Sequence, residues 1–310
     1  MFKNKEYVLA IYREGGFTKA AERLYISQPS LSASVKRIED KISCPIFDRS
    51  SSPLGLTEVG EAYVKRALEL EELENDFKQY VSDRFNLVRG KIRIGGSSLF
   101  SSYVLPKLVA EFTRQYKDIQ FEIFEDSTKN LISKLNSGIL DIIIDNAVIK
   151  DENVIFEPYT SESLLLAVPK KFQINEKLKD YRLLSEDVKS GKFLTFKAVS
   201  LVEFKDLPFV LLNPENDTGS RAIKMFKKYG ISPTVLFHLD QQITAYNVTC
   251  SGMGISFVSD ALVKNAPNEH GVYFYKLNDL SAQRKIYFYQ KKNRYLSTAC
   301  RKFIECNKEK

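Results

Sequence analysis

The stretch that decides the fold begins with Gly16-Phe-Thr-Lys-Ala-Ala-Glu-Arg-Leu24 and continues with Ser27-Gln-Pro-Ser-Leu-Ser-Ala-Ser-Val-Lys-Arg-Ile-Glu-Asp-Lys-Ile42. Each run has the apolar spacing of a short amphipathic helix, and a sharp turn separates them. Ala20 and Ala21 are small enough to let two helices cross closely. The stretch therefore predicts a helix-turn-helix, in which the second helix enters the major groove of DNA.

The second helix has a defined start and a defined inner face. Ser27 is a good N-cap, and Pro29 falls in the first turn, where its missing N–H costs nothing. Apolar residues then recur at helical spacing and must face a core. This stripe consists of Leu31, Val35, Ile38 and Ile42.

The face opposite this stripe holds Pro29, Lys36 and Arg37, with Gln28 and Ser32 on a flank, and these side chains suit DNA. Gln28 can form paired hydrogen bonds with adenine, and Ser32 can donate to a base edge or accept from it. Lys36 and Arg37 suit phosphate groups. Taken alone, this helix also fits an ordinary amphipathic helix with a solvated face. The helix before it favours the interpretation as a DNA-binding helix.

The flanking segments complete a winged helix. Cys44-Pro45 stops the second helix, residues 48–53 form a polar loop, and residues 54–56 return as a short strand. Arg49 therefore lies at the wing. An earlier helix, set off by Gly15-Gly16, supplies the rest of a small core. Its predicted stripe is Tyr7, Val8, Ile11 and Tyr12.

These motifs, together with Phe47-Asp-Arg49 and Leu56-Thr57, resemble those of the LysR-type transcriptional regulators. The resemblance is specific in the N-terminal segment and weaker, in length and domain order, over the rest of the chain. The family often has a long basic or polar side chain where this chain has Ala33, so we expect less direct base reading and more readout of DNA shape. The resemblance implies DNA contacts at Thr18, Gln28, Pro29, Ser32 and Arg49.

Length and charge bound the remaining possibilities. A chain of 310 residues fits about two domains, and the sequence has no apolar run long enough for a membrane span. Its charged start is unlike a signal peptide, so we expect a cytoplasmic protein with reduced thiols. The net charge of +7 is no argument for DNA binding, because residues 1–88 hold 13 Lys and Arg against 14 Asp and Glu. Attraction to phosphate must depend on local placement of cations.

Residues 58–86 have the pattern of one long helix. Apolar residues recur at threes and fours with glutamates outside, which is typical of a coiled-coil seam. A helix packed on its own domain is the alternative, but the hinge-like Arg89-Gly90 that follows favours a partner helix from a second chain. A dimer or tetramer places two recognition helices on two half-sites. The stripe is Tyr63, Ala67, Leu70, Leu73, Phe77 and Tyr80.

From Lys91 onward, strands alternate with helices, which predicts an α/β domain with largely parallel pairing. The resemblance implies two Rossmann-like subdomains with two crossovers, similar to periplasmic binding proteins. We therefore expect an α/β protein overall with three parts. These are an all-α winged helix-turn-helix at residues 1–58, a long linker and dimerisation helix at 59–89, and a two-lobed effector-binding domain at 90–310.

Such a two-lobed domain binds its ligand between the lobes, where strand ends and helix starts supply donors. Gly95-Gly-Ser-Ser98, Ser127-Thr128 and Asn213-Pro214 occupy such places. Glycines let N–H groups approach an anion, and a cleft poor in acidic groups suits a small anionic effector. Serines that only cap helices are the alternative. The resemblance implies effector contacts at Ser97, Ser98, Thr128 and Asn213.

No catalytic or metal site is predicted. His238 and His270 lack metal-ligand spacing, the Gly95 run lacks the lysine of a phosphate loop, and no Gly-x-Ser-x-Gly elbow is present. We expect no cofactor. The predicted function is a sequence-specific DNA-binding transcription regulator that responds to a small effector. The alternative is a solute-binding protein or an enzyme that uses the two-lobed domain.

Overall fold

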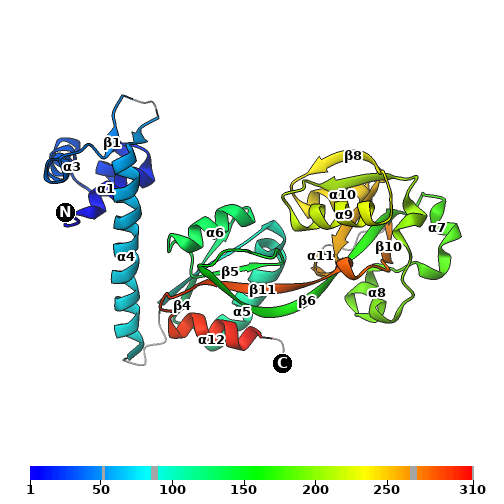
Figure 1. Cartoon of the computed structure of the whole chain (residues 1–310). Helices are drawn as coiled ribbons and strands as arrows, with labels where there is room; N and C mark the ends of the chain where they lie inside the picture. The colour runs from blue at the N-terminus through cyan, green and yellow to red at the C-terminus, as the bar shows by residue number, and fades with distance from the viewer. Residues whose placement is uncertain (51–52, 85–89, 266–270, 309–310) are drawn as a thin grey trace. The chain divides into compact units, whose positions relative to one another are not determined.

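The computed structural model divides the chain into two units (Figure 1). The N-terminal unit comprises Met1–Leu87 with Ser137–Ile139, and the C-terminal unit comprises Val88–Asn136 with Leu140–Lys310. The structure describes residues 1–50, 53–84, 90–265 and 271–308. Arg89, part of the predicted hinge, and His270, one of the two histidines considered as metal ligands, lie outside the described residues.

The N-terminal unit is a winged helix-turn-helix, as predicted. A two-stranded antiparallel hairpin forms the wing beside three short helices. These elements are α1 (Lys5–Glu14), α2 (Phe17–Arg23), α3 (Gln28–Ile42), β1 (Phe47–Asp48) and β2 (Gly55–Leu56).

Helix α3 begins and packs as its sequence predicts. The Ser30 backbone N–H donates to Ser27 Oγ at 3.3 Å, so Ser27 is the N-cap. Leu31, Val35 and Ile38 of the apolar stripe are buried in the unit's core, and Ile42 is partly buried against it. The helix ends at Ser43, which adopts a left-handed φ of 58°, one residue before the predicted stop.

The predicted stripe of α1 is wrong at one position. Tyr12 is 49% exposed, whereas Leu9 and Ala10 are buried together with Val8 and Ile11. Helix α1 contacts α2, α3 and the following long helix, so neighbours cover every face of its middle turn. Tyr12 lies beyond that turn.

The long helix α4 (Glu58–Arg84) has two different halves. In the first half Tyr63 and Ala67 are buried in the core of the N-terminal unit, because α1 packs along it. In the second half Leu73 and Phe77 are each 66% exposed, and Tyr80 is 42% exposed. A single continuous seam is therefore a wrong prediction for the first half, where the alternative of packing on its own domain holds.

One mixed sheet runs through the C-terminal unit. Its described strands follow the order β4-β3-β5-β11-β6-β9-β7-β8, with β10 also paired to β6. The strands are β3 (Gly90–Gly96), β4 (Ile119–Glu125), β5 (Ile142–Asp145), β6 (Val154–Pro169), β7 (Pro208–Leu212), β8 (Thr234–Leu239), β9 (Ile255–Ser259), β10 (Val272–Lys276) and β11 (Gln283–Lys291).

The sheet is shared by two lobes that β6 and β11 connect (Figure 1). These two strands pair antiparallel with each other and with all their other neighbours. Only the pairs within each lobe, β3 with β4 and β5, and β7 with β8 and β9, are parallel. The prediction of largely parallel pairing is therefore wrong for the sheet as a whole, because the two crossover strands each return through both lobes.

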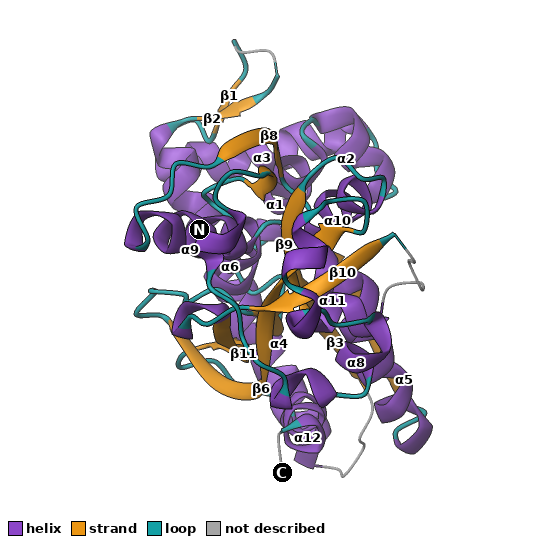
Figure 2. Ribbon diagram, turned by 90° about the vertical axis from the view of Figure 1, so that its right-hand side faces the viewer, coloured by secondary structure: helices purple, strands orange, loops and turns teal. Residues whose placement is uncertain are grey.

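Helices surround the strands of both lobes, and Figure 2 shows α9, α10 and α11 around those of the second lobe. Helices α7, α8 and α11 were not predicted, because segments of four to six residues are too short to show a helical period. No helix among the described residues is long and apolar enough to cross a bilayer. The helices are η1 (Phe100–Val104), α5 (Leu105–Gln115), α6 (Thr128–Asn136), α7 (Ile174–Lys177), η2 (Lys179–Tyr181), α8 (Ser185–Lys189), η3 (Lys192–Thr195), η4 (Leu201–Phe204), α9 (Asp217–Lys228), α10 (Gln242–Cys250), α11 (Asp260–Asn265), η5 (Leu280–Ala282) and α12 (Thr298–Asn307).

Candidate functional site

The outer face of α2, α3 and the wing presents polar side chains to solvent. Ser32 is partly buried, and the other predicted DNA contacts are exposed. Within the described residues, the side chains of Thr18, Gln28, Ser32, Lys36 and Arg37 make no hydrogen bond or ion pair with other residues. The exposed contacts are Thr18, Gln28, Pro29, Lys36, Arg37 and Arg49.

Arg49 differs from these residues because Glu39 holds it in place. Arg49 Nη2 donates to Glu39 Oε2 at 3.3 Å, and the guanidinium carbon lies 5.2 Å from the centre of the Phe17 ring. The other oxygen of Glu39 accepts the backbone N–H groups of Ile46 at 2.8 Å and Phe47 at 3.4 Å. Glu39 therefore fixes the start of the wing, and Arg49 on it, to α3. No sequence pattern predicted this role of Glu39, because its partners follow a turn and share no periodicity with it.

In the first lobe, two of the predicted effector contacts bind carboxylates of the chain itself. Ser98 Oγ donates to Glu125 Oε1, and Thr128 Oγ1 donates to Asp145 Oδ2 at 2.8 Å. Burial raises the pKa of the Asp145 carboxyl, although hydrogen bonds from Ala147 and Thr128 oppose that rise. Ser97 is partly buried beside them.

The second lobe repeats this arrangement. Asn213 Nδ2 donates to Asp240 Oδ1 at 2.6 Å. Together with Glu125 and Asp145, Asp240 shows that the prediction of a cleft poor in acidic groups is wrong. Glu125 and Asp145 are the last residues of β4 and β5, and Asp240 follows β8. Each lies 17 or 27 residues from the side chain that donates to it, so inspection of the short donor segments missed the pairing.

Gly95 and Gly96 also have a different role from the predicted one. Both lie inside β3 and are buried, not in a loop open to a ligand. A Cβ on Gly95 would lie 2.7 Å from Leu131 Cδ2, and one on Gly96 would lie 2.9 Å from Phe100 Cβ. The two glycines therefore permit close packing against β3, and they belong to a strand and not to the predicted loop.

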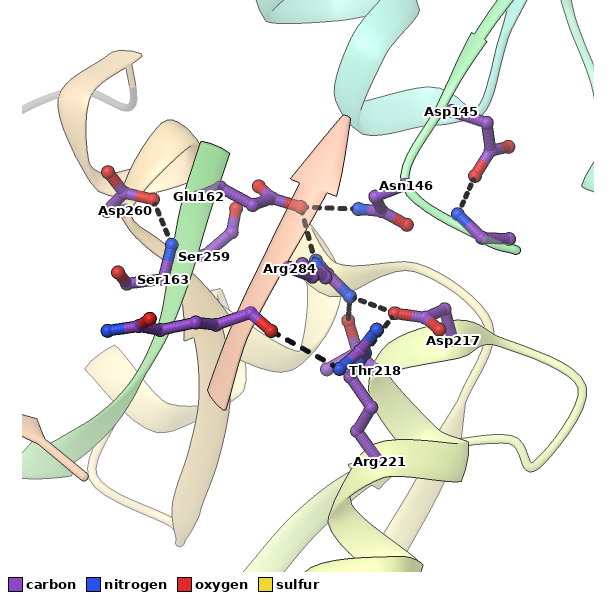
Figure 3. Close-up of polar contacts among 12 residues, drawn as sticks. Asp145, Asn146, Glu162, Ser163, Asp217, Thr218, Arg221, Ser259, Asp260 and Arg284 are labelled. Carbon is purple, nitrogen blue, oxygen red and sulfur yellow. Dashed lines mark hydrogen bonds and ion pairs between the residues drawn. The ribbon is translucent and has the colours of Figure 1, made fainter. Parts of the chain in front are cut away.

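A buried ion-pair network connects the lobes (Figure 3). The side chains of Arg284 on β11 and Glu162 on β6 are each 1% exposed, and Arg284 Nε lies 2.5 Å from Glu162 Oε1. Arg284 Nη1 also donates to Asp217 Oδ2 at 2.7 Å and to Thr218 Oγ1 at 3.0 Å. Asn146 follows β5, and its Nδ2 donates to Glu162 Oε1 at 2.6 Å. The network therefore joins the end of a first-lobe strand to the start of α9 in the second lobe.

The local sequence explains how α9 reaches this network. Asn216 Oδ1 caps the helix by accepting the Thr218 N–H at 2.9 Å. A Cβ on Gly219 would lie 2.3 Å from the Asn213 carbonyl oxygen, so only glycine permits this close approach of α9 to the end of β7. The sequence contained no signal for Arg284 or Glu162, because each belongs to a strand whose partners come from other segments.

A cavity of about 430 Å³ lies between α5, α8 and α11, with β6 and β11 contributing to its lining. Lysine, tyrosine and carboxylate side chains line it, and none of the four predicted effector contacts does. Among the described residues, no group of three or more His, Cys, Asp or Glu side chains could hold a metal ion.

Comparison with protein-family models gives two matches. The model described as bacterial regulatory helix-turn-helix protein, lysR family, matches residues 2–61. The LysR substrate binding domain matches residues 86–310.

Relatives of similar length support these matches. An uncharacterised HTH-type transcriptional regulator, YcgK of Bacillus subtilis, is 25% identical over 99% of this chain and 94% of its own length. A probable RuBisCO transcriptional regulator of Synechocystis is 26% identical over 95% of this chain and 82% of its own.

Solved structures share the fold. A full-length OxyR variant from Pseudomonas aeruginosa gives a TM-score of 0.73 at 22% identity, covering 96% of this chain and 91% of that one. Full-length CbnR in complex with its target DNA gives 0.65 at 18% identity, covering 99% and 98%. The effector-binding domain of QuiR in complex with shikimate gives 0.56 at 21% identity, covering 70% and 94%. The predicted order, a helix-turn-helix followed by a two-lobed domain, is confirmed.

Proposed function

Because this chain belongs to the LysR family of DNA-binding transcription regulators, we propose that it reads an operator through α3 and the wing, under the control of a small molecule bound in its C-terminal unit. The alternative of an enzyme or a solute-binding protein is set aside, since the family and the relatives are transcription regulators. We assign DNA binding to residues 1–58, linkage and assembly to 59–89, and effector binding to 90–310. Its place of action is the cytoplasm, where a bacterial operator lies.

The observation that carries this proposal is the outward face of α3. Leu31, Val35 and Ile38 of its apolar stripe are buried, so the orientation of the helix is fixed. The side chains of Gln28, Ser32, Lys36 and Arg37 have no hydrogen bond or ion pair with another described residue. Gln28 and Ser32, near the N-terminus of the helix, are placed to reach base edges, and Lys36 and Arg37 to reach phosphates. We assign the remaining contacts to Thr18, Pro29 and Arg49. CbnR, solved with its target DNA, supports this general mode.

Self-association follows from the second half of α4. Leu73, Phe77, Tyr80 and Val81 expose apolar surface among the charged and polar side chains of this half. A second copy of the same helix covers such a stripe in a coiled coil. A dimer, or a tetramer made of two dimers, then presents two recognition helices to two half-sites.

Effector control is assigned to the two lobes of the C-terminal unit. A ligand that binds one arrangement of the lobes better than another shifts the population between them. That shift changes how copies pack and how the bound DNA bends. Ser97, Ser98, Thr128 and Asn213 remain proposed contacts, with the difference that at least three of them already donate to carboxylates.

Fluorescence anisotropy of the full chain on DNA from upstream of its own gene tests the proposal. We expect binding on the order of 10³ tighter than to random DNA of the same length. Arg49→Ala should weaken binding to both DNAs alike and lower the slope of log K against log salt by about one. Lys224→Ala, an exposed change on α9, is the matched control and should leave the slope unchanged. Equal affinity for upstream and random DNA would contradict the proposal.

A further inference from the structure

Tyr25 lies in the turn between α2 and α3 and has a backbone conformation that is unusual for tyrosine. Its φ of 54° is in the left-handed region, which glycine adopts without strain because it has no Cβ. The Tyr25 N–H donates to the Glu22 carbonyl oxygen at 3.1 Å. The Ile26 N–H donates to the Ala21 carbonyl oxygen, also at 3.1 Å. These two bonds form a Schellman motif, in which the left-handed residue is usually glycine.

The side chain of Tyr25 adds nothing to the core of the N-terminal unit. It is 96% exposed, the largest value for any large apolar or aromatic side chain among the described residues. It makes no hydrogen bond or ring contact within the described part of the chain. Its neighbours Leu24 and Ile26 are partly buried against the core. The fold therefore accounts for both neighbours of Tyr25 but for neither the backbone nor the ring of Tyr25 itself. Strain that the fold does not need points to a function.

The position of the turn indicates which molecule Tyr25 meets. In a helix-turn-helix on DNA, the first helix crosses the sugar-phosphate backbone and the second places its N-terminal residues against base edges. The turn joins these two places, and Tyr25 is three residues before Gln28. Tyrosine is among the side chains that donate to phosphate oxygens. A long, exposed phenol at the edge of the groove suits such a contact.

We propose that Tyr25 is a DNA contact, and that its hydroxyl donates to a phosphate oxygen at the edge of the major groove. The tyrosine lowers the stability of the turn and raises the affinity for DNA. Because a phosphate is present at every step of the duplex, the contact carries no base preference. Because the phenol is neutral, it adds affinity without neutralising a phosphate charge. The inference rests on the proposed function, in which α3 lies in the major groove.

Tyr25→Gly separates stability from affinity, because it relaxes the backbone and removes the ring. We expect the midpoint of urea unfolding of the full chain to rise. Affinity for the upstream DNA should fall about tenfold, the effect of losing a hydrogen bond to a charged group. Ser43→Gly is the matched control, since the exposed Ser43 ends α3 with a φ of 58°. That control should raise the midpoint and leave the affinity unchanged. An unchanged affinity for Tyr25→Gly, or a lower midpoint, would overturn the proposal.

Tyr25→Phe removes the hydroxyl alone. It should keep the unfolding midpoint and weaken binding to upstream and random DNA alike, while the slope of log K against log salt stays unchanged. Tyr12→Phe, at another exposed tyrosine of the same unit, should change none of these quantities. Wild-type affinity for Tyr25→Phe, or a loss confined to the upstream DNA, would overturn the proposal. A wild type that does not prefer upstream DNA contradicts the proposed function instead, and the Tyr25 variants on random DNA still decide this inference.

Neutral methylphosphonates, placed one at a time in the upstream DNA, locate the contact. We expect one position in each half-site where the substitution weakens binding of the wild type but weakens binding of Tyr25→Phe no further. If every substitution affects the two proteins equally, Tyr25 contacts no phosphate and the proposal is overturned.

Discussion

The polar side chains of the two units are used in opposite ways. On α3 in the N-terminal unit, Gln28, Lys36 and Arg37 point to solvent and have no partner among the described residues. In the C-terminal unit the candidate donors Thr128 and Asn213 already bind carboxylates of the chain. Exposed polar groups such as Gln28 are satisfied by water until another molecule arrives, whereas the partly buried Thr128 and Asn213 have partners within the fold. The N-terminal unit therefore presents its proposed DNA contacts to solvent. The C-terminal unit builds its candidate effector contacts from segments that are separate in sequence.

The apolar stripe of α4 contains a similar contrast on a smaller scale. Tyr63 and Ala67 are covered by their own unit, whereas Leu73 and Phe77 are not. The same spacing therefore serves internal packing in one half and, in our proposal, a second chain in the other.

Substitutions in the exposed half of α4 should have the largest effect on assembly and operator binding. We expect Leu73→Lys with Phe77→Lys to abolish assembly, because two ammonium groups replace the apolar surface that a coiled-coil partner covers. Operator binding should fall with assembly, because two half-sites are no longer read together. Light scattering and anisotropy measure the two effects.

Asn75→Lys is the matched control for this test, since it adds charge to an exposed neighbouring position outside the apolar stripe. An unchanged molar mass for the double variant would show that Leu73 and Phe77 do not hold the assembly together.

The buried network of the C-terminal unit gives the next largest effect. Arg284→Met leaves the Glu162 carboxylate buried without its guanidinium, and losing one partner of a buried pair costs about 3–5 kcal/mol of unfolding free energy. Asp217 keeps Arg221 as a partner, 2.7 Å away, so Glu162 carries most of the cost. Urea unfolding of the full chain, followed by circular dichroism, measures it.

Two further variants sharpen this result. Lys285→Met changes an exposed neighbour on the same strand and should stay within about 0.5 kcal/mol of the wild type. Adding Glu162→Leu to Arg284→Met should recover part of the loss, because the unpaired charge is gone. If Arg284→Met is as mild as Lys285→Met, the network does not stabilise the unit.

The elements predicted most reliably from the sequence are those that depend on neighbouring residues. The cap at Ser27 and the stripe of α3 depend only on neighbouring residues, and the structure has both. The strands were located by their apolar runs, but their direction was not, because β6 and β11 take it from partners more than a hundred residues away in the chain. Helices as short as α7 and α11 have no readable period.

The candidate sites follow the same division. On α3 the proposed DNA contacts Gln28, Pro29, Lys36 and Arg37 are exposed, as the spacing of the buried stripe indicated. Glu39 could not be predicted, because it acts by accepting backbone N–H groups beyond a turn. Arg284 could not be predicted either, since a charged residue next to Lys285 in a strand reveals neither its burial nor its partners. The cavity lined by Lys107 and Lys264 exists only once α5 and α11 come together.

The most direct test of the account is a binding-site selection from random DNA with the wild type and with Gln28→Ala. The account holds that the outward face of α3 reads bases, and that Gln28 has its partner in DNA and not in the protein. We expect the variant to keep the selected motif except at one position in each half-site, where the matched base loses about 1–3 kcal/mol of discrimination. The same motif with the same preference at every position would contradict the assignment of Gln28 as a base contact.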